Sequence, residues 1–283
     1  MSSRTFRTAF RAMGTDWWIS CDVPHLLRAA EAQVRRLEAR LSRFRAGSAL
    51  TRLNLAREVR DATLAAATRS ALALRAETGG AFDPTLGARL ASLGYDRAFV
   101  AVGRPAPAAP CPRGEPLRVT VRGDRVRLEG PGALDLGGIA KGWAVDRVLE
   151  RLRRGGARRG LVDGGGDLGA FGGPWRVGAG DGLVIEVGDG AVATSSVLVR
   201  RWRDADGVPL HHVLDPRTGH PARATIDTAT VSAADAATAD GLATALLVDP
   251  ARVVARLPAL GARAALRDHD GRWWTTADWS DAA

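Results

Sequence analysis

The stretch Asp135-Leu-Gly-Gly-Ile-Ala-Lys-Gly-Trp-Ala-Val-Asp146 is the most informative part of the chain. Two adjacent glycines precede an apolar-periodic run, a pattern typical of a strand-to-helix turn. The stretch also contains Lys141, the single lysine among 40 basic Lys and Arg residues. Arginine cannot replace lysine where a compact ammonium must fit a tight pocket, because its guanidinium is a wide planar fork. We therefore expect Lys141 to serve a site, with chance survival on a solvated face as the alternative.

Two other residue types are equally rare. Asn54 is the only asparagine, and Met13 is the only methionine after the initiator. A chain biased toward Ala, Arg and Gly is expected to keep a rare type where its chemistry is needed. Gln33 and Tyr95 are also single residues, and the sequence suggests no function for either.

The composition is that of a soluble globular protein, with 283 residues, 46% apolar and 25% charged. A net charge of +9 favours a phosphate-bearing ligand, whereas basic residues spread along the chain without interleaved aromatics argue against a nucleic-acid surface. Cys21 and Cys111 have no metal-binding or redox spacing, so no disulfide framework is expected. No apolar run reaches transmembrane length, and Met1 to Arg11 lacks the apolar segment of a signal peptide. A cytoplasmic location is the resulting expectation.

The first half is expected to be mostly helical after two strands at 4–12 and 17–23. Apolar residues at helical spacing run from Leu26 to Phe44, and Ser48 is the expected N-cap of a short helix ending near Asn54. An Ala-rich helix is predicted at 62–78 and an Ala- and Pro-rich surface loop at 101–116. Between them, Asp83 precedes a proline and is read from these residues alone as part of a simple turn.

The second half is expected to be rich in strands. A helix is predicted from Ile139 to about Arg154, and another over 234–248. Short strands are predicted at 117–122, 125–129, 159–162, 175–179, 183–187, 191–195, 197–203, 228–232, 263–269 and 272–276. The glycine loop Asp163-Gly-Gly-Gly-Asp167 has neither Walker A nor dinucleotide-fold spacing, so neither of those nucleotide-binding classes applies.

Two motifs carry candidate chemistry. Asp240 and Thr244 lie four residues apart in a predicted helix, so their oxygens share a face and suit a hard cation such as Mg²⁺. The same spacing is also common on solvated faces. His211 and His212 are adjacent and would point to opposite sides of a strand, so they are not expected to share a metal. One of them is a candidate base; the alternative is a surface histidine.

Taken together, these stretches resemble the ApbE family, the FAD:protein FMN transferases. The resemblance runs from Met13 to about Asp249. Eight pieces follow the family's order: Met13-Gly-Thr15, Ser48 to Asn54, Ala81-Phe-Asp-Pro84, Asp135 to Asp146, Gly164-Gly-Gly-Asp167, Ala193-Thr-Ser195, His212-Val-Leu-Asp-Pro-Arg-Thr-Gly219 and Ala239-Asp-Gly-Leu-Ala-Thr244.

The resemblance implies an α+β fold, namely one ApbE-like, T-fold-related domain over 1–283 with two lobes and antiparallel sheets flanked by helices. It implies that FAD is cut and its FMN half moved to a threonine hydroxyl of an acceptor flavoprotein, with release of AMP. It further implies three Mg²⁺ ligands: the carbonyl of Gly138 and the side chains of Asp240 and Thr244. His212 matches the proposed base, and Asp240, Lys141 and His212 form the implied catalytic set.

Residues that match the family's FAD-binding positions are Met13, Phe44, Ala81, Phe82, Asp83, Asp135, Lys141 and Leu214. Two positions depart from the family pattern: Ser196 stands where glycine is frequent, and Asp163 where asparagine is common. Many relatives are exported lipoproteins, which contrasts with the cytoplasmic expectation. Two rival functions stay open: an FAD pyrophosphatase that uses water as acceptor, and a flavin carrier without turnover.

Overall fold

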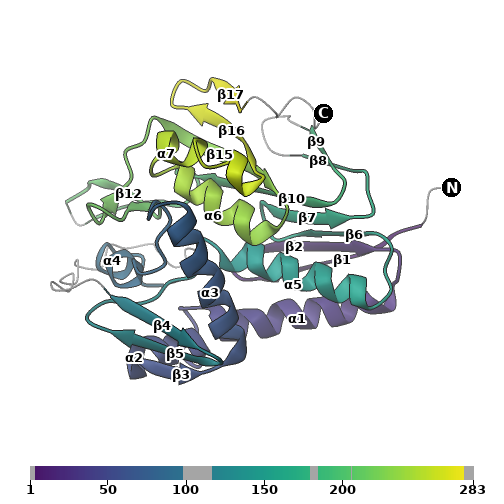
Figure 1. Cartoon of the computed structure of the whole chain (residues 1–283), viewed down its shortest axis with the longest axis horizontal. Coiled ribbons are helices and arrows are strands. Elements are labelled where there is room, and N and C mark those ends of the chain that lie inside the picture. Colours follow the sequence, from purple (N-terminus) through teal and green to yellow (C-terminus); the bar gives the residue numbers. More distant parts are fainter. Residues whose placement is uncertain (1–3, 98–116, 179–183, 205, 277–283) are drawn as a thin grey trace.

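The computed structural model describes residues 4–97, 117–178, 184–204 and 206–276 (Figure 1). The predicted loop at 101–116, with Cys111, lies outside the described residues.

An eight-stranded sheet, antiparallel throughout, forms the centre of the molecule. Its central strand β7 is buried along its whole length, which requires cover on each face of the sheet. In spatial order the strands are β1 (Phe6–Ala12), β2 (Thr15–Cys21), β6 (Gly160–Asp163), β7 (Asp167–Phe171), β10 (Gly190–Ser196), β15 (Ile226–Ala233), β16 (Arg263–Asp268) and β17 (Trp273–Thr275).

Three helices cover one face of this sheet (Figure 1). They are α1 (His25–Leu41) against β1 and β2, α5 (Ala140–Arg154) against β6 and β7, and α6 (Ala236–Leu246) against β10 and β15. Leu27, Val34 and Leu41 in α1 recur at helical spacing and are buried, so a single apolar stripe orients this helix. On the opposite face, the hairpin of β8 (Trp175–Gly178) and β9 (Val184–Val187) packs on β7 and β10.

A second, smaller lobe lies beside the sheet (Figure 1). It contains the three-stranded sheet β3-β5-β4, with helices α2 and α3 packed on it and α4 nearby. The bounds are α2 (Ala49–Ala56), β3 (Glu58–Arg60), α3 (Ala62–Glu77), α4 (Gly87–Ser92), β4 (Arg118–Arg122) and β5 (Arg125–Glu129).

The lone Asn54 has a structural task in this lobe. Its Nδ2 donates to the Leu134 carbonyl at 2.9 Å, and its Oδ1 accepts from the Leu134 N–H at 2.8 Å. A side-chain amide carries a donor and an acceptor side by side, so it can pair with both the N–H and the C=O of one residue. Asn54 therefore holds the chain just before Asp135.

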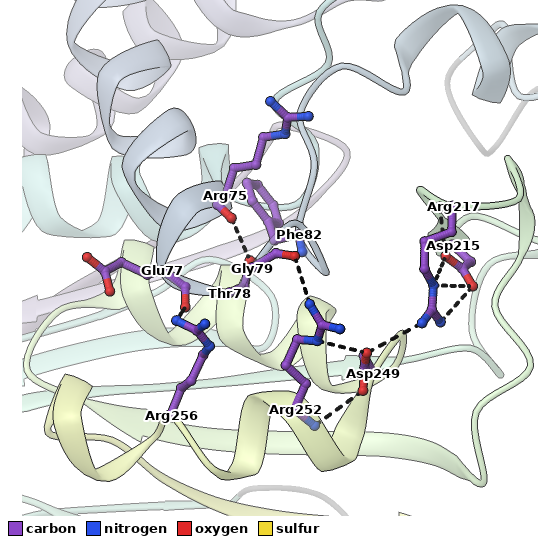
Figure 2. Close-up of polar contacts among 10 residues, drawn as sticks. All are labelled: Arg75, Glu77, Thr78, Gly79, Phe82, Asp215, Arg217, Asp249, Arg252 and Arg256. Carbon is purple, nitrogen blue, oxygen red and sulfur yellow. Dashed lines mark hydrogen bonds and ion pairs between the residues drawn. The ribbon is translucent and has the colours of Figure 1, made fainter. Parts of the chain in front are cut away.

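The two lobes are joined by contacts at the end of α3 (Figure 2). Arg256 donates to the Glu77 carbonyl at 2.9 Å, and Arg252 of α7 (Pro250–Val254) donates to the Gly79 carbonyl at 3.4 Å. Asp249 pairs with Arg252 at 3.3 Å and with Arg217 at 3.6 Å. The guanidinium groups of Arg252 and Arg256 thus donate to carbonyls that the end of a helix leaves unpaired.

Short antiparallel pairs complete the described fold: β11 (Arg201–Arg203) with β12 (Pro209–His211), and β13 (Leu214–Asp215) with β14 (His220–Pro221). A short 3₁₀ turn, η2 (Pro258–Leu260), precedes β16. None of the helices in these four described ranges combines the length and the apolar character that crossing a bilayer requires.

The predicted fold class, α+β with antiparallel sheets flanked by helices, is confirmed. One local prediction was wrong, and one strand of the main sheet was missed. Residues 197–200 do not extend a strand over 197–203; they leave β10 in a turn, and β11 begins only at Arg201. Strand β7 was not predicted, because the glycines around Asp167 conceal a strand that is buried on both faces and shows no alternation.

Candidate active site

Lys141 lies between two buried carboxylates. Its Nζ contacts Asp167 directly and stands 3.9 Å from Asp240 Oδ2. The side chain of Lys141 is 15% exposed, against 1% for Asp167 and 3% for Asp240. Three elements meet here: the first turn of α5, the start of β7 and the middle of α6. This burial argues against the alternative of a solvated face, and the role of Lys141 in a site stays a prediction.

The charges of this cluster are strongly coupled. Burial disfavours the Lys141 ammonium, but the carboxylates of Asp167 and Asp240 outweigh it and raise the pKa of Lys141 above its ordinary value. Burial and the nearby charge of Asp240 raise the pKa of Asp167 to about 7. Among the described residues, Lys141 is the one cation that forms ion pairs with these two buried carboxylates.

Helix α6 presents Asp240 and Thr244 on one face, as predicted. Asp240 Oδ2 accepts from the Gly142 N–H at 3.2 Å, and Thr244 Oγ1 lies 3.3 Å from Ser195 Oγ. Gly138 is beside them: a methyl group at its Cα would stand 3.4 Å from Thr244 Oγ1. The structure thus brings all three residues of the implied Mg²⁺ set into one corner.

This corner fits a hard cation. Carboxylate, hydroxyl and carbonyl oxygens are the ligands that Mg²⁺ prefers. Asp167 Oδ1 is buried and has no hydrogen-bond partner among the residues described, so one carboxylate oxygen beside the corner is left without a donor. No group of three His, Cys, Asp or Glu side chains that would hold a metal by themselves occurs in the described ranges. The carbonyl and hydroxyl would have to complete the set.

Phe82 lines the same corner. Its ring atom Cε2 would stand 3.1 Å from a methyl at Gly138, so a side chain there would require the ring to shift by a few tenths of an ångström. Ala81 and Phe82 are buried. The Phe82 N–H donates to Thr78 Oγ1 at 3.1 Å, and both residues are labelled in Figure 2. Asp83 is held by Arg75 at 2.9 Å and accepts from the Thr85 N–H at 2.8 Å. This geometry agrees with the simple turn predicted from the residues alone.

A second group of expected FAD-binding residues lies at the small lobe. Asp135 pairs with Arg43 at 2.5 Å, and Phe44 is 39% exposed beside it. Met13 has a positive φ of 51° and donates its N–H to Glu38 Oε1 at 2.9 Å. Glu38 also holds Arg45 at 2.8 Å, which ties Met13 to the segment that carries Phe44.

The stretch from His211 to Leu214 forms the remaining side of the candidate site. His211 Nε2 contacts the Ala222 carbonyl at 3.1 Å, whereas His212 Nδ1 is buried without a partner in the described part of the chain. Desolvation, then the charge of Arg200, lower the pKa of His212 to about 3, and His211 and Lys141 add to this. His212 therefore lies within the field of the Lys141 cluster and is neutral at neutral pH. Leu214 is buried in β13, two residues further on.

Two residues at the site were not identified as candidates from the sequence. Asp167 closes the glycine loop, and a carboxylate following three glycines was the available signal. Arg43 is one of 39 arginines and carries no sequence signal, because its burial depends on a helix and a loop meeting in space.

Comparison with solved structures defines the class of fold. A crystal structure of an ApbE protein from Thermotoga maritima superimposes with a TM-score of 0.84 at 28% identity, covering 99% of each chain. A Treponema pallidum protein named FAD:protein FMN transferase is 35% identical over 253 residues, covering 76% of this chain and 68% of that relative. Its Salmonella typhimurium namesake is 32% identical over 269 residues, covering 84% and 77%.

The ApbE family model matches residues 13–264. The chain belongs to the ApbE family.

Proposed function

We propose that this protein transfers the FMN half of FAD to a threonine hydroxyl of an acceptor flavoprotein and releases AMP, with Mg²⁺ as cofactor. The observation that carries the proposal is the buried cluster of Lys141, Asp167 and Asp240 beside Thr244. A flavin carrier, which only stores FAD, does not need a buried cluster of charged groups beside the phosphates. The names of the two relatives support the same chemistry.

The proposed reaction is a phosphoryl substitution. The threonine oxygen bonds to the phosphorus of the FMN half, and the bond from that phosphorus to the bridging oxygen breaks. AMP leaves with that oxygen. Charge that develops on the phosphates must be neutralised, and Lys141 supplies a fixed ammonium at the amino-terminal end of α5, where the helix dipole also favours an anion. Mg²⁺ bound by Gly138, Asp240 and Thr244 would supply further positive charge to the phosphate oxygens.

His212 is the proposed acceptor of the threonine proton. Its imidazole is neutral at neutral pH, the state that a base requires. Its basicity is low in the protein alone, because burial and Arg200 oppose a second positive charge. An anionic pyrophosphate between Lys141 and Arg200 would offset those charges and raise the affinity of His212 for a proton. Substrate binding would thus prepare the base.

A mass spectrum tests the proposal. The protein is incubated with FAD, Mg²⁺ and a threonine-bearing flavoprotein, with EDTA as control. An acceptor heavier by one FMN unit, with AMP released only when Mg²⁺ is present, is the expected result. FMN and AMP without an adduct would favour the pyrophosphatase. Intact FAD bound to unmodified protein would favour the carrier.

An Asp240→Ala variant tests the metal assignment within the same assay. Loss of Mg²⁺-dependent turnover by more than about 100-fold is expected, because a bound metal is worth several kcal/mol of charge stabilisation. The melting temperature is measured in parallel to show that the variant is folded. Full activity in a folded Asp240→Ala protein would exclude Asp240 as a ligand.

A further inference from the structure

The hairpin of β11 and β12 leads directly into the proposed base. β12 ends at His211, and His212 is the next residue along the chain. Arg201 pairs with His211 across the hairpin. Arg200, the residue before β11, lies close enough for its charge to act on both His212 and Lys141. A second substrate held along this hairpin would therefore reach the proposed site.

The backbone of β11 points its hydrogen-bonding groups outward. In an antiparallel pair, residues that face each other alternate between exchanging two backbone hydrogen bonds and exchanging none. The Asp204 N–H donates to the Val208 carbonyl at 3.0 Å, so the neighbouring pair, Arg203 with Pro209, is one that exchanges none. The missing N–H of Pro209 agrees with this. The pair of Arg201, two residues earlier, is of the same kind. The N–H and C=O groups of Arg201 and Arg203 therefore point away from β12.

The outer edge of β11 is open. In the four described ranges, no backbone hydrogen bond is made by the outward groups of Arg201 or Arg203. The opposite edge, along β12, lacks a donor at Pro209, and proline is a common way to block an edge. Trp202 holds β11 in place, because its Nε1 donates to the Leu93 carbonyl at 2.7 Å. An open edge strand that is held in place is a template for one more strand.

Positive charge lies along this edge. Arg201 and Arg203 are exposed and project from the same face of β11, since one residue separates them. Arg201 forms no ion pair in the part of the chain that the structure describes. Asp204 and Asp206 lie in the turn, at the end of the hairpin remote from His212. An edge with this charge favours an acidic partner.

Apolar side chains are exposed at both ends of β11. Leu198 and Val199, just before it, are 42% and 72% exposed, and Val208, in the connection to β12, is 50% exposed. A small ligand is enclosed by a concave pocket, whereas exposed apolar side chains around a charged strand edge suit another protein. The surface therefore fits the second substrate of the proposed reaction, which is a protein.

We propose that the acceptor flavoprotein pairs an extended, acidic segment with the outer edge of β11, as an added strand, and thereby brings its threonine to His212. This inference rests on the proposed function. Residues two apart in the added strand would face Arg201 and Arg203 on one side of the sheet, so the segment carries carboxylates at alternate positions. The threonine lies beyond them toward Arg200, because that end of β11 borders the site.

Amide hydrogen exchange tests the pairing without turnover. The probe is a threonine-bearing flavoprotein whose target threonine is replaced by valine, added to the unmodified protein with FAD and Mg²⁺. We expect exchange at the Arg201 and Arg203 amides to slow by at least about 10-fold, since both would then donate to the added strand. Binding of this acceptor without slower exchange at either amide would overturn the inference. Slowing that depends on the protein's own concentration, without acceptor, would assign the edge to a second copy of this chain and also overturn it.

Two substitutions at one position test the edge itself. Arg203→Ala and Arg203→Pro both remove the side chain, but only proline removes the outward N–H, and no bond to β12 is lost with it. KM for the acceptor is expected to be at least about 5-fold higher in Arg203→Pro than in Arg203→Ala, with the affinity for FAD equal in both. Calorimetry with FAD shows that each variant is folded.

Substitutions of Arg201 test the charge. Arg201→Glu should raise KM for the acceptor by at least about 10-fold, because like charges would meet along the added strand, and Arg201→Lys should leave it within about 2-fold. Arg118→Glu, at an exposed position of β4 in the small lobe, is the matched control for the change in net charge.

The outcomes separate this inference from the proposed function. If the unmodified protein forms no FMN adduct on the acceptor, the proposed function fails, and the inference fails with it. If adducts form but Arg203→Pro equals Arg203→Ala, or Arg201→Glu equals Arg118→Glu, in KM for the acceptor, the inference alone is overturned.

Discussion

Lys141 is singled out both by the composition of the chain and by its position in the structure. A lone lysine in an arginine-rich chain lies against Asp167 and near Asp240, at 15% exposure. A single ammonium can contact one carboxylate and still face a ligand, whereas a planar fork would tend to bridge both carboxylates. A lysine therefore suits the proposed site better than an arginine would.

Lys141→Arg is expected to keep the charge and lose the function. A guanidinium in this confined position would displace Asp167 or Asp240, and kcat/KM for FAD should fall by at least about 10-fold. Initial rates of AMP release at varied FAD concentrations measure the effect. Kinetics equal to those of the unmodified protein would mean that the lone lysine is an accident of composition.

His212 is expected to make stability depend on pH. Its folded pKa of about 3 lies below the ordinary value of 6.5, so between these values the unfolded chain binds a proton that the folded chain excludes. The stability that the neutral His212 contributes to the fold is therefore fully present above pH 6.5. As the pH falls below this value, the free energy of unfolding decreases by up to about 1.4 kcal/mol per pH unit. His212→Gln should flatten the slope between about pH 6.5 and 4.5, measured by urea unfolding. Parallel slopes for the two proteins would contradict the assignment.

At the scale of elements, the site depends on how closely α5 approaches α6. A methyl group at Gly142 would overlap the Ala236 carbonyl and stand 2.9 Å from Asp240 Cβ. Asp146 on the same helix accepts the N–H groups of Ala236 at 2.8 Å and Ala237 at 2.9 Å, so α5 also caps α6. These contacts bring the ammonium of one helix to the carboxylate of the other.

Gly142→Ala should therefore separate the two helices. We expect a loss of about 1–3 kcal/mol in the free energy of unfolding, as for other overpacked sites, together with weaker Mg²⁺-dependent turnover. Denaturant unfolding and the mass-spectrometric assay measure the two effects. Gly47→Ala is the control, since no atom lies within 4 Å of a methyl at that exposed glycine. Equal losses in both variants would argue against the close approach.

At the scale of the whole molecule, the site is assembled from both lobes. Gly138 precedes α5, and Lys141 lies in its first turn. Asp240 and Thr244 belong to α6, and Phe82 follows α3 from the small lobe. The ion pairs of Asp249 with Arg217 and Arg252 help to hold the end of α3 against the larger lobe (Figure 2). The lobes must therefore keep their relative position for the corner to exist.

Asp249→Asn keeps the helix cap but removes the charge. Because Arg217 and Arg252 are more than half exposed, the change should be small: a fall in Tm of less than about 3 °C, which disappears in about 1 M NaCl. Thermal melts at low and high salt measure it. Asp124→Asn, which removes an exposed pair with Arg60 within the small lobe, is the control for a general charge effect. A Tm difference that persists in high salt would show that the contribution is not electrostatic.

Much of the fold was determined by the sequence itself. The apolar stripes of α1 and α5, the cap at Ser48 and most strands follow local rules, because periodicity and capping act within a few residues. The sequence also singled out Lys141, Asp240 and Thr244, through rarity and helical spacing. Strand β7 was missed, since a strand buried on both faces has no alternation to detect.

Only the tertiary structure decided which groups share one environment. Asp167 meets Lys141 because β7 lies beneath α5, and Arg43 meets Asp135 because the segment after α1 folds against the small lobe. The rarity of Asn54 suggested that its chemistry is needed, and in the structure its side chain holds the chain at Leu134 through two hydrogen bonds. Burial, charge coupling and unpaired donors arise between distant segments, so no local pattern encodes them.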